Sequence, residues 1–155
     1  MPEARYPRPA RRRVHLDFHT PDFAENVGAN FDADALTDAL AEGRVEQAAF
    51  FAKCHYGSAY YPTRVGRAHP GLKTDMLGRF VEAGAKRGVR TFAYYSLQLD
   101  WWYATQHPHC AQQPRPFFEP SCGHWKSVCI AGDYGRYARD QIAEAFEALL
   151  TGRYV

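Results

Sequence analysis

The sequence lacks an uninterrupted apolar run close to the roughly 18 residues that a membrane helix needs, so no membrane-spanning protein is expected. Neither usual form of the glycine-rich phosphate loop is present, which predicts that no nucleotide or other cofactor is bound. There is no Cys-x-x-Cys pair either. The chain of 155 residues is long enough to fold without disulfide bonds. We therefore expect free thiols in a reducing, cytoplasmic environment at all four cysteines: Cys54, Cys110, Cys122 and Cys129.

The sequence also lacks a strong excess of one charge. It holds 19 Lys and Arg residues against 17 Asp and Glu residues, a net charge of +2. Five of the arginines lie in residues 1–13 with one acid, which leaves residues 14–155 slightly acidic. Nucleic acid is therefore not the expected partner. We expect residues 1–13 to form a solvated, disordered tail, with nucleic-acid contact as the weaker alternative, and residues 14–155 to form one domain.

What is present is an alternation of strand-like and helix-like segments. Residues 14–19, 45–53 and 89–97 are rich in apolar, β-branched and aromatic residues and predict strands. Helical spacing of apolar residues predicts helices from Asp32 or Asp34, over about 73–87, and over about 134–150. The order β-α-β-α-β-α is typical of right-handed βαβ units on a parallel sheet.

A glycine follows each expected helix, at Gly43, Gly88 and Gly152. Glycine is the usual C-cap because it adopts the left-handed backbone conformation without a steric penalty. A strand should open just after each glycine, and the third such strand would begin where the sequence stops. The pattern thus predicts a fold cut before its fourth strand. Exposed sheet edges then favour poor solubility or a homo-oligomer.

The expected loops are long after the strands and short after the helices. The strand-to-helix loops have roughly 14, 20 and 35 residues, as in βα enzyme scaffolds, where chemistry lies at the carboxyl ends of the strands. These loops and strand ends hold most of the imidazole and indole side chains: His19, His55, His69, His107, His109, His124, Trp101, Trp102 and Trp125.

Aromatic rings beside polar groups are typical of carbohydrate sites, because rings stack on sugar C–H faces while polar groups bind hydroxyls. Asp100-Trp101-Trp102-Tyr103 has this character, although a tryptophan there could instead fill the barrel mouth. His55, next to Lys53, Tyr56 and Gly57, is either a sugar ligand or a structural histidine. His19 ends the first strand on the face of His15 and Asp17, and Asp17 could simply orient these imidazoles.

A metal site is the weaker interpretation of the third loop. His107-Pro108-His109-Cys110 is followed only by Cys122, His124 and Cys129, without the paired spacing of structural zinc sites. We therefore expect no metal, with a metal-dependent hydrolase as a remaining alternative. Among the carboxylates, Glu119 is a weak candidate acid, and Glu144 is expected to be merely solvated.

Several motifs together resemble a known family. The segment 52–57 (Ala-Lys-Cys-His-Tyr-Gly), then 60–63 (Tyr-Tyr-Pro-Thr) and His69-Pro70, resembles the second-strand motif of the hypothetical glycosyl hydrolase 6 group, which is similar to the α-L-fucosidases of glycoside hydrolase families 29 and 151. Residues 14–20 resemble its first strand, and Tyr94-Tyr95-Ser96-Leu97 its third. Family 29 commonly has His-Asp-Gly at residues 55–57, and the hypothetical group often has a second histidine at Tyr56.

The resemblance implies the N-terminal portion, about three βα units, of an α/β fold, the (β/α)₈ TIM-type barrel, in a retaining glycoside hydrolase of α-L-fucosidase type. It implies that the aspartate nucleophile ends strand four, beyond Val155, so that this chain holds no catalytic residue and is inactive alone. A carbohydrate substrate would contact His19, Lys53, His55, Tyr56, Tyr95, Asp100, Trp101 and Trp102. The alternative is a non-catalytic carbohydrate- or partner-binding module.

Overall fold

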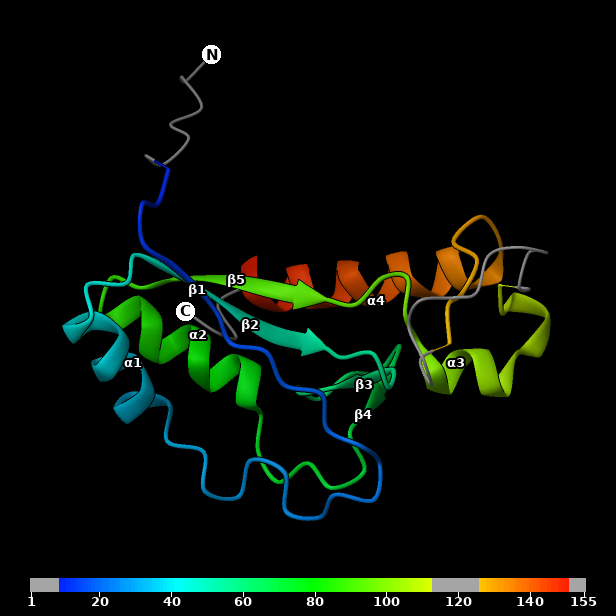
Figure 1. Ribbon diagram of the computed structural model, residues 1–155, viewed down its shortest axis with the longest axis horizontal. Helices are drawn as coiled ribbons and strands as arrows, with labels where there is room; N and C mark the ends of the chain where they lie inside the picture. The colour runs from blue at the N-terminus through cyan, green and yellow to red at the C-terminus, as the bar shows by residue number, and fades with distance from the viewer. Residues whose placement is uncertain (1–8, 113–125, 151–155) are drawn as a thin grey trace, which may run out of the picture.

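The computed structural model describes residues 9–112 and 126–150, with side chains described as far as Glu147. Within these residues the predicted strands and helices occur in the predicted order, with additional short elements between them (Figure 1). The elements are β1 (Arg13–His15), α1 (Ala33–Glu42), β2 (Gln47–Lys53), β3 (Ser58–Ala59), β4 (Arg67–Ala68), α2 (Met76–Lys86), β5 (Arg90–Tyr95), α3 (Trp101–Gln106), the 3₁₀ helix η1 (Pro108–Cys110) and α4 (Asp133–Leu150).

The centre of the sheet is parallel, as predicted. β1 and β5 both pair in parallel with β2, on its two opposite edges, and the arrows of β2 and β5 point the same way in Figure 1. β1 is shorter than predicted. Its ladder ends at His15, and the backbone N–H of Leu16 donates the last hydrogen bond to Ala49. Residues 17–19 therefore lie beyond the strand, at the carboxyl end of the sheet.

Two short strands that we did not predict occupy the loop after β2. β3 pairs antiparallel with the end of β2, with Ala59 opposite Lys53, and β4 pairs in parallel with β3. Because β5 occupies the other edge of β2, β3 continues the edge along which β1 has already ended. The chain after His15 therefore leaves the edge of β2.

The helices begin where carboxylates can cap them. Asp32 caps α1 by accepting a hydrogen bond from the Ala35 N–H at 2.9 Å, and Asp75 caps α2 in the same way from Gly78 at 2.8 Å. The expected left-handed glycine is present at Gly88, with φ of +70°. At the end of α1 it is Arg44, not Gly43, that has positive φ, so this part of the prediction was wrong.

The described fold includes residues that precede the predicted domain boundary at Val14. Arg13 lies in β1, Ala10 is buried, and the Arg11 N–H bonds the Glu46 carboxylate. Residues 1–8 and the third expected glycine turn, at Gly152, lie outside the described residues. Among the described helices, none has the length and apolar character needed to cross a bilayer.

The two faces of the sheet differ because successive side chains alternate along each strand. Ala48 and Phe50 of β2 face the helices, where Phe50 stacks on Phe80 of α2 with ring centroids 4.4 Å apart. The opposite face carries Phe51, which stacks on Tyr94 of β5 at 4.3 Å. Phe92 of β5 is more than half exposed on that face.

A β-bulge near the end of β2 interrupts this alternation. Phe51 is opposite Tyr94, but Lys53 is opposite Tyr95, so β2 advances two residues while β5 advances one. Bulges of this kind redirect the side chains that follow them. Here the bulge turns Lys53 onto the Tyr95 face, toward α4, instead of the face of Phe51.

Candidate functional site

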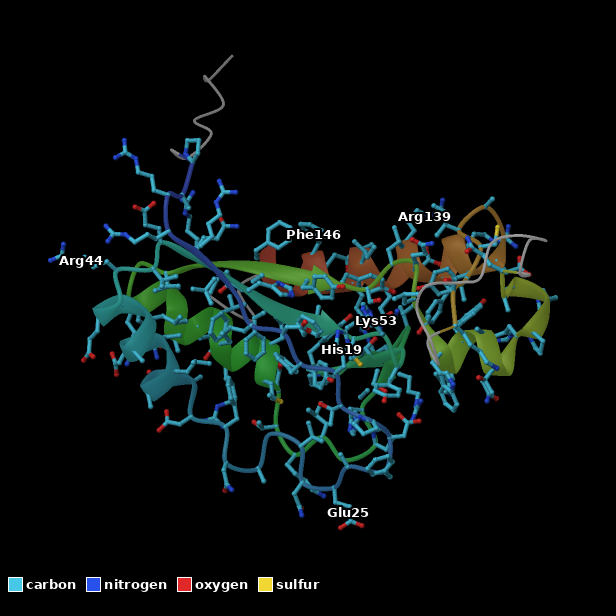
Figure 2. All side chains as sticks on the ribbon, viewed as in Figure 1. His19, Glu25, Arg44, Lys53, Arg139 and Phe146 are labelled. Carbon is cyan, nitrogen blue, oxygen red and sulfur yellow. The ribbon has the colours of Figure 1, made fainter. Side chains whose placement is uncertain are left out.

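The carboxyl ends of β1, β2 and β5 meet at one edge of the sheet, as parallel strands require. Figure 2 shows His19 and Lys53 at this edge, beside the arrowhead of β2. The polar side chains here come from the loop after β1, from the end of β2 and its loop, and from the residues directly after β5. They form two groups, a histidine pair on one side and a buried ion pair on the other.

His19 and His55 form the histidine pair, with ring centroids 3.9 Å apart. The backbone N–H of His55 donates to His19 Nδ1 at 3.3 Å, so that this nitrogen carries the lone pair. The proton of a neutral His19 is therefore on Nε2, which lies 3.1 Å from Asp17 Oδ1. Asp17 thus orients His19 and selects its tautomer.

His55 has the opposite tautomer. Ser96 has one hydroxyl hydrogen, which it donates to the Leu99 carbonyl at 2.8 Å. The Ser96 oxygen must then accept in its 2.7 Å contact with His55 Nδ1. The proton of a neutral His55 is therefore on Nδ1, and the lone pair is on Nε2.

Both imidazoles are neutral near pH 7. Burial lowers the pKa of His55 to about 4, with a further lowering by the adjacent His19. Burial also lowers the pKa of His19, against the opposing effect of Asp17. Neutral imidazoles can both donate and accept hydrogen bonds, which is the capacity that a hydroxyl-bearing ligand requires.

Lys53 and Asp100 form the buried ion pair. Lys53 Nζ lies 2.8 Å from Asp100 Oδ2, and neither side chain has exposed surface. The ammonium group also donates to the Ser96 carbonyl at 2.8 Å and lies 4.8 Å from the centre of the Tyr95 ring. Burial lowers the pKa of Lys53, and the Asp100 carboxylate opposes this effect. The pair fixes Ser96, and Ser96 in turn fixes His55.

Asp100 also joins the loop after β2 to α3. Its Oδ1 caps α3 by accepting from the Tyr103 N–H at 2.8 Å. The first two N–H groups of α3 bond the carbonyls of His55 and Tyr56, at 3.0 and 3.2 Å. Gly57, with φ of +87°, lies so close that an added Cβ would be 2.2 Å from Asp100 Oδ1. The loop that carries His55 is therefore held by α3.

The predicted aromatic residues are divided between the two faces. Trp101 and Trp102 of α3 and the neighbouring Tyr56 are half-buried, and the Arg67 guanidinium lies 5.5 Å from the centre of the Trp102 ring. The Tyr95 hydroxyl donates to Gln141 of α4 at 2.7 Å, on the face opposite the histidines. Tyr95 is thus part of the α4 packing.

Sequence reasoning missed Tyr94 and Ser96. Tyr94 packs against His15, with ring centroids 5.2 Å apart, and Ser96 bonds His55. Alternation along β5 could have indicated that Tyr94 and Ser96 share a face and that Tyr95 does not. The register of β2 against β5 was needed to know which face the histidines occupy.

Other predicted residues lie elsewhere. Glu144 is not merely solvated, because its side chain is only 10% exposed and accepts hydrogen bonds from Thr63 and Arg64. Burial raises the pKa of Glu144, but these bonds outweigh it and lower the pKa below its usual value. The cysteines Cys54, Cys110 and Cys129 are free thiols, as expected. Outside the described residues lie Glu119, Cys122, His124 and Trp125.

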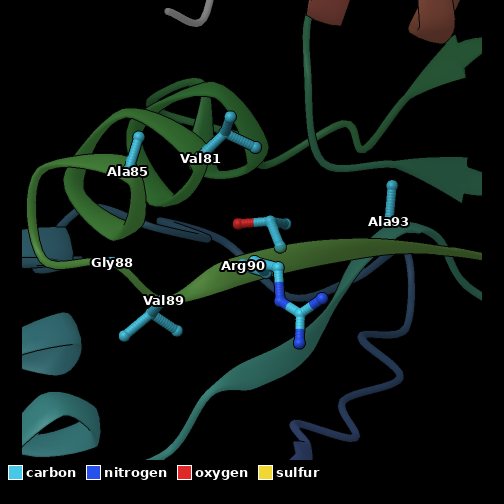
Figure 3. Close-up of a pocket in the computed structure, with 7 residues that line it drawn as sticks. Val81, Ala85, Gly88, Val89, Arg90 and Ala93 are labelled. Carbon is cyan, nitrogen blue, oxygen red and sulfur yellow. The ribbon is translucent and has the colours of Figure 1, made fainter. Parts of the chain in front are cut away.

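A shallow hollow of about 420 Å³ lies at the other end of β5. Figure 3 shows it between α2 and the start of β5, with Val81 and Ala85 on one side and Arg90 and Ala93 on the other. Its lining is mostly apolar, and it lies at the amino end of the strand. It therefore forms no part of the histidine site.

Two solved structures similar to this chain are those of fucosidases. The structure of alpha-L-fucosidase isoenzyme 2 from Paenibacillus thiaminolyticus is 31% identical and matches with a TM-score of 0.75, over 84% of this chain and 21% of that one. The Thermotoga maritima alpha-fucosidase in complex with fucose is 22% identical, with a TM-score of 0.59, over 76% of this chain and 26% of that one. The second match supports the fold alone.

The chain therefore spans about a fifth to a quarter of the length of these two proteins. Comparison with curated proteins gave no match. The sequence profile described as "Hypothetical glycosyl hydrolase 6" matches residues 32–151, which include β2, β5 and the four α-helices of the described residues. With the α/β fold and the fucosidase neighbours, this match shows that the chain belongs to the hypothetical glycosyl hydrolase 6 family.

Proposed function

We propose that this chain forms the N-terminal βα units of a (β/α)₈ glycoside hydrolase domain that acts on α-L-fucosides, and that it provides part of the sugar-binding surface. Membership of a glycosyl hydrolase family and the 31% identical fucosidase neighbour support the reaction class. The parallel order β1-β2-β5, with α1 and α2 on one face, is compatible with part of such a barrel.

The observation that carries the proposal is the pair His19 and His55, in the loops that follow β1 and β2. Asp17 and Ser96 hold the two rings in opposite tautomers. Each sugar hydroxyl is both a donor and an acceptor, and a neutral imidazole matches it because it too has one donor and one acceptor nitrogen. Because the pKa of His55 is lowered to about 4, its imidazole stays neutral in mildly acidic solution.

The buried residues of the predicted set act on the site indirectly. Lys53 and Asp100 have no exposed surface, so in this proposal they position Ser96 and the His55 loop and do not contact sugar. Tyr95 supports α4 in the same way. The partly exposed rings of Tyr56, Trp101 and Trp102 remain as candidates for stacking on the sugar.

The proposal includes no turnover by this chain alone. Retaining glycosidases need two carboxyl groups about 5 Å apart, one as the nucleophile and one as the acid/base. Asp17 is the carboxylate that the described contacts place beside the histidines, and it is engaged with His19. By the family resemblance, the nucleophile belongs to a fourth strand. We therefore propose that this chain contributes recognition and that other residues cleave the bond.

The test is a titration of the chain with L-fucose, monitored by the NMR signals of its histidine side chains. We expect saturable shifts of the His19 and His55 imidazole signals. In His55→Ala, the sugar should no longer shift the His19 signals. His109→Ala, which removes an exposed imidazole outside this site, is the matched control and should bind as the parent does. D-galactose and D-glucose serve as comparison sugars.

The possible results separate the alternatives. Shifts with fucose alone support the fucosidase assignment. Shifts only with another sugar would keep the histidine site but overturn the substrate. If no sugar shifts either histidine, the histidine site is not a sugar site in this chain. Release of aryl alcohol from an aryl α-L-fucoside by the chain would overturn the proposal that this chain only binds the sugar and that other residues cleave the bond.

A further inference from the structure

Three side chains of different chemistry converge away from the histidine site, where η1 approaches the start of α4. They are His109 and Cys110 of η1 and Asp133 of α4. One possible metal-ligating atom from each lies within 4.8 Å of the other two. Among the described residues, this is the one group of three His, Cys, Asp or Glu side chains that comes so close together.

The separation of two of these atoms fits ligands of one metal ion better than a hydrogen bond. His109 Nε2 lies 3.6 Å from Asp133 Oδ2, which is too long for a hydrogen bond. A zinc ion bound to nitrogen and oxygen at about 2.0–2.2 Å with tetrahedral angles would separate them by about 3.4 Å. Only a small approach of two exposed side chains is needed to reach that geometry.

The Asp133 carboxylate is already oriented for this role. The Arg136 guanidinium bonds its Oδ1, while the other oxygen, Oδ2, faces His109. Carboxylate ligands of metal ions are commonly held through their second oxygen in this way. Arg136 therefore leaves Oδ2 directed toward the other two residues of the group.

Cys110 is the most firmly placed of the three. Its side chain is buried, its N–H donates to the His107 carbonyl at 2.9 Å, and its carbonyl accepts from the Cys129 N–H at 2.8 Å. A thiolate with an imidazole and a carboxylate is a donor set that suits zinc, and three protein ligands leave a fourth position for water or another ligand.

We propose that His109, Cys110 and Asp133 bind a zinc-type divalent cation that fastens η1 to the start of α4. The site would lie beside the packing of Tyr103 of α3 on Tyr134 of α4, whose ring centroids are 5.0 Å apart. A metal ion that binds the folded chain and not the unfolded chain stabilises the fold. The site does not include the sugar-binding histidines, so it stands or falls independently of the proposed function.

The test is a titration of the reduced, chelator-treated 155-residue chain with Co²⁺, which reports its ligands by absorbance. We expect one equivalent to bind, with a thiolate-to-cobalt charge-transfer band and the intense visible bands of tetrahedral cobalt. Zn²⁺ should displace the cobalt, abolish the bands and raise the melting temperature. Absence of the charge-transfer band at saturating Co²⁺ would overturn the proposal.

Variants identify the ligands. Cys110→Ser should abolish the charge-transfer band, and His109→Ala should weaken binding by at least about tenfold. Because Cys110 is buried, circular dichroism of the serine variant checks its fold, and the exposed His109 variant gives an independent answer. Cys129→Ser and His19→Ala are controls that should keep the bands. A band that survives Cys110→Ser, or that is lost in Cys129→Ser or His19→Ala, would show that the site lies elsewhere.

Discussion

Lys53 Nζ lies 2.8 Å from Asp100 Oδ2, and both side chains are completely buried although 47 positions of sequence separate them. Taking two charges out of water is costly, and their attraction offsets that cost only while both partners are present. The pair therefore stabilises the loops after β2 and β5 only while both charged side chains are present. Removing one partner leaves the other charge buried without compensation.

Asp100→Asn should destabilise the chain by about 3–5 kcal/mol, because it leaves the Lys53 ammonium buried without its counter-charge while keeping an oxygen to cap α3. Urea denaturation followed by circular dichroism measures the change. Asp38→Asn is the matched control, since Asp38 pairs with Arg87 at the surface and its loss should have little effect. Equal stability of the two variants would contradict the proposed role of the buried pair.

Gly57→Ala should be more disruptive than Gly88→Ala, although both glycines have positive φ. An added Cβ at Gly88 meets nothing within 4 Å, so that variant loses only about 1–2 kcal/mol to backbone strain. At Gly57 the Cβ would lie 2.2 Å from Asp100 Oδ1, which should cost about 1–3 kcal/mol more through forced movement of the carboxylate. Paired urea titrations measure the difference in stability. Indistinguishable urea midpoints would mean that the Asp100 carboxylate can move away from the added Cβ with no loss of stability.

Stability should fall as the pH is lowered from about 6.5 to about 4. The pKa of His55 is about 4 in the fold, whereas a histidine in the unfolded chain has its ordinary pKa of 6.5, so in this range the unfolded chain binds a proton that the folded chain does not. The melting temperature measured across this range should decline less steeply in His55→Gln. An unchanged slope in the His55 variant would place the acid sensitivity elsewhere.

Ser96→Ala should release His55 from its Nδ1-protonated tautomer, because the variant lacks the hydroxyl oxygen that accepts from Nδ1. Nitrogen-15 NMR of labelled histidine distinguishes the two neutral tautomers by their ring shifts. The parent should show Nδ1 protonated, and the variant a mixture of both tautomers. Ser127→Ala serves as the control for loss of a partly exposed serine outside these contacts. A parent His55 protonated on Nε2 would overturn the assignment.

The chain should self-associate through the face of the sheet that carries Phe92. Phe92 is 57% exposed on β5, and within the described residues β5 pairs with β2 alone. Exposed apolar groups beside an unpaired strand edge favour association. Sedimentation velocity should show concentration-dependent oligomers that Phe92→Lys reduces and that Phe23→Lys, at an 86% exposed loop position, does not. A monomer at every concentration would contradict this prediction.

Local pattern was enough to predict the order and type of the main elements. The signals used were the helix cap at Asp32, the helical spacing of apolar residues, and the runs of β-branched and aromatic residues. Each signal spans only a few positions, so it can be recognised in the sequence alone. The same holds for His55, just after the second strand, whereas His19, expected to end the first strand, lies in the loop after β1. The short elements β3, β4 and α3 were missed because two to six residues carry too little periodicity to be recognised.

The roles of individual side chains depended on the tertiary structure. Lys53, Tyr95 and Asp100 were predicted together with the histidines, but the β-bulge between Phe51 and Lys53 turns the lysine to the other face. A bulge is a property of two paired strands and cannot be recognised in either strand alone.

The sequence by itself thus determined the family, the alternation of strands and helices, and the gathering of histidines at one edge of the sheet, because these follow from local spacing and motif. Only the tertiary structure decided that Lys53 pairs with Asp100 out of contact with solvent, that Ser96 selects the tautomer of His55, and that Asp133 lies beside His109. Each of these depends on which segments distant in the sequence pack together, and that is set by the free energy of the whole fold.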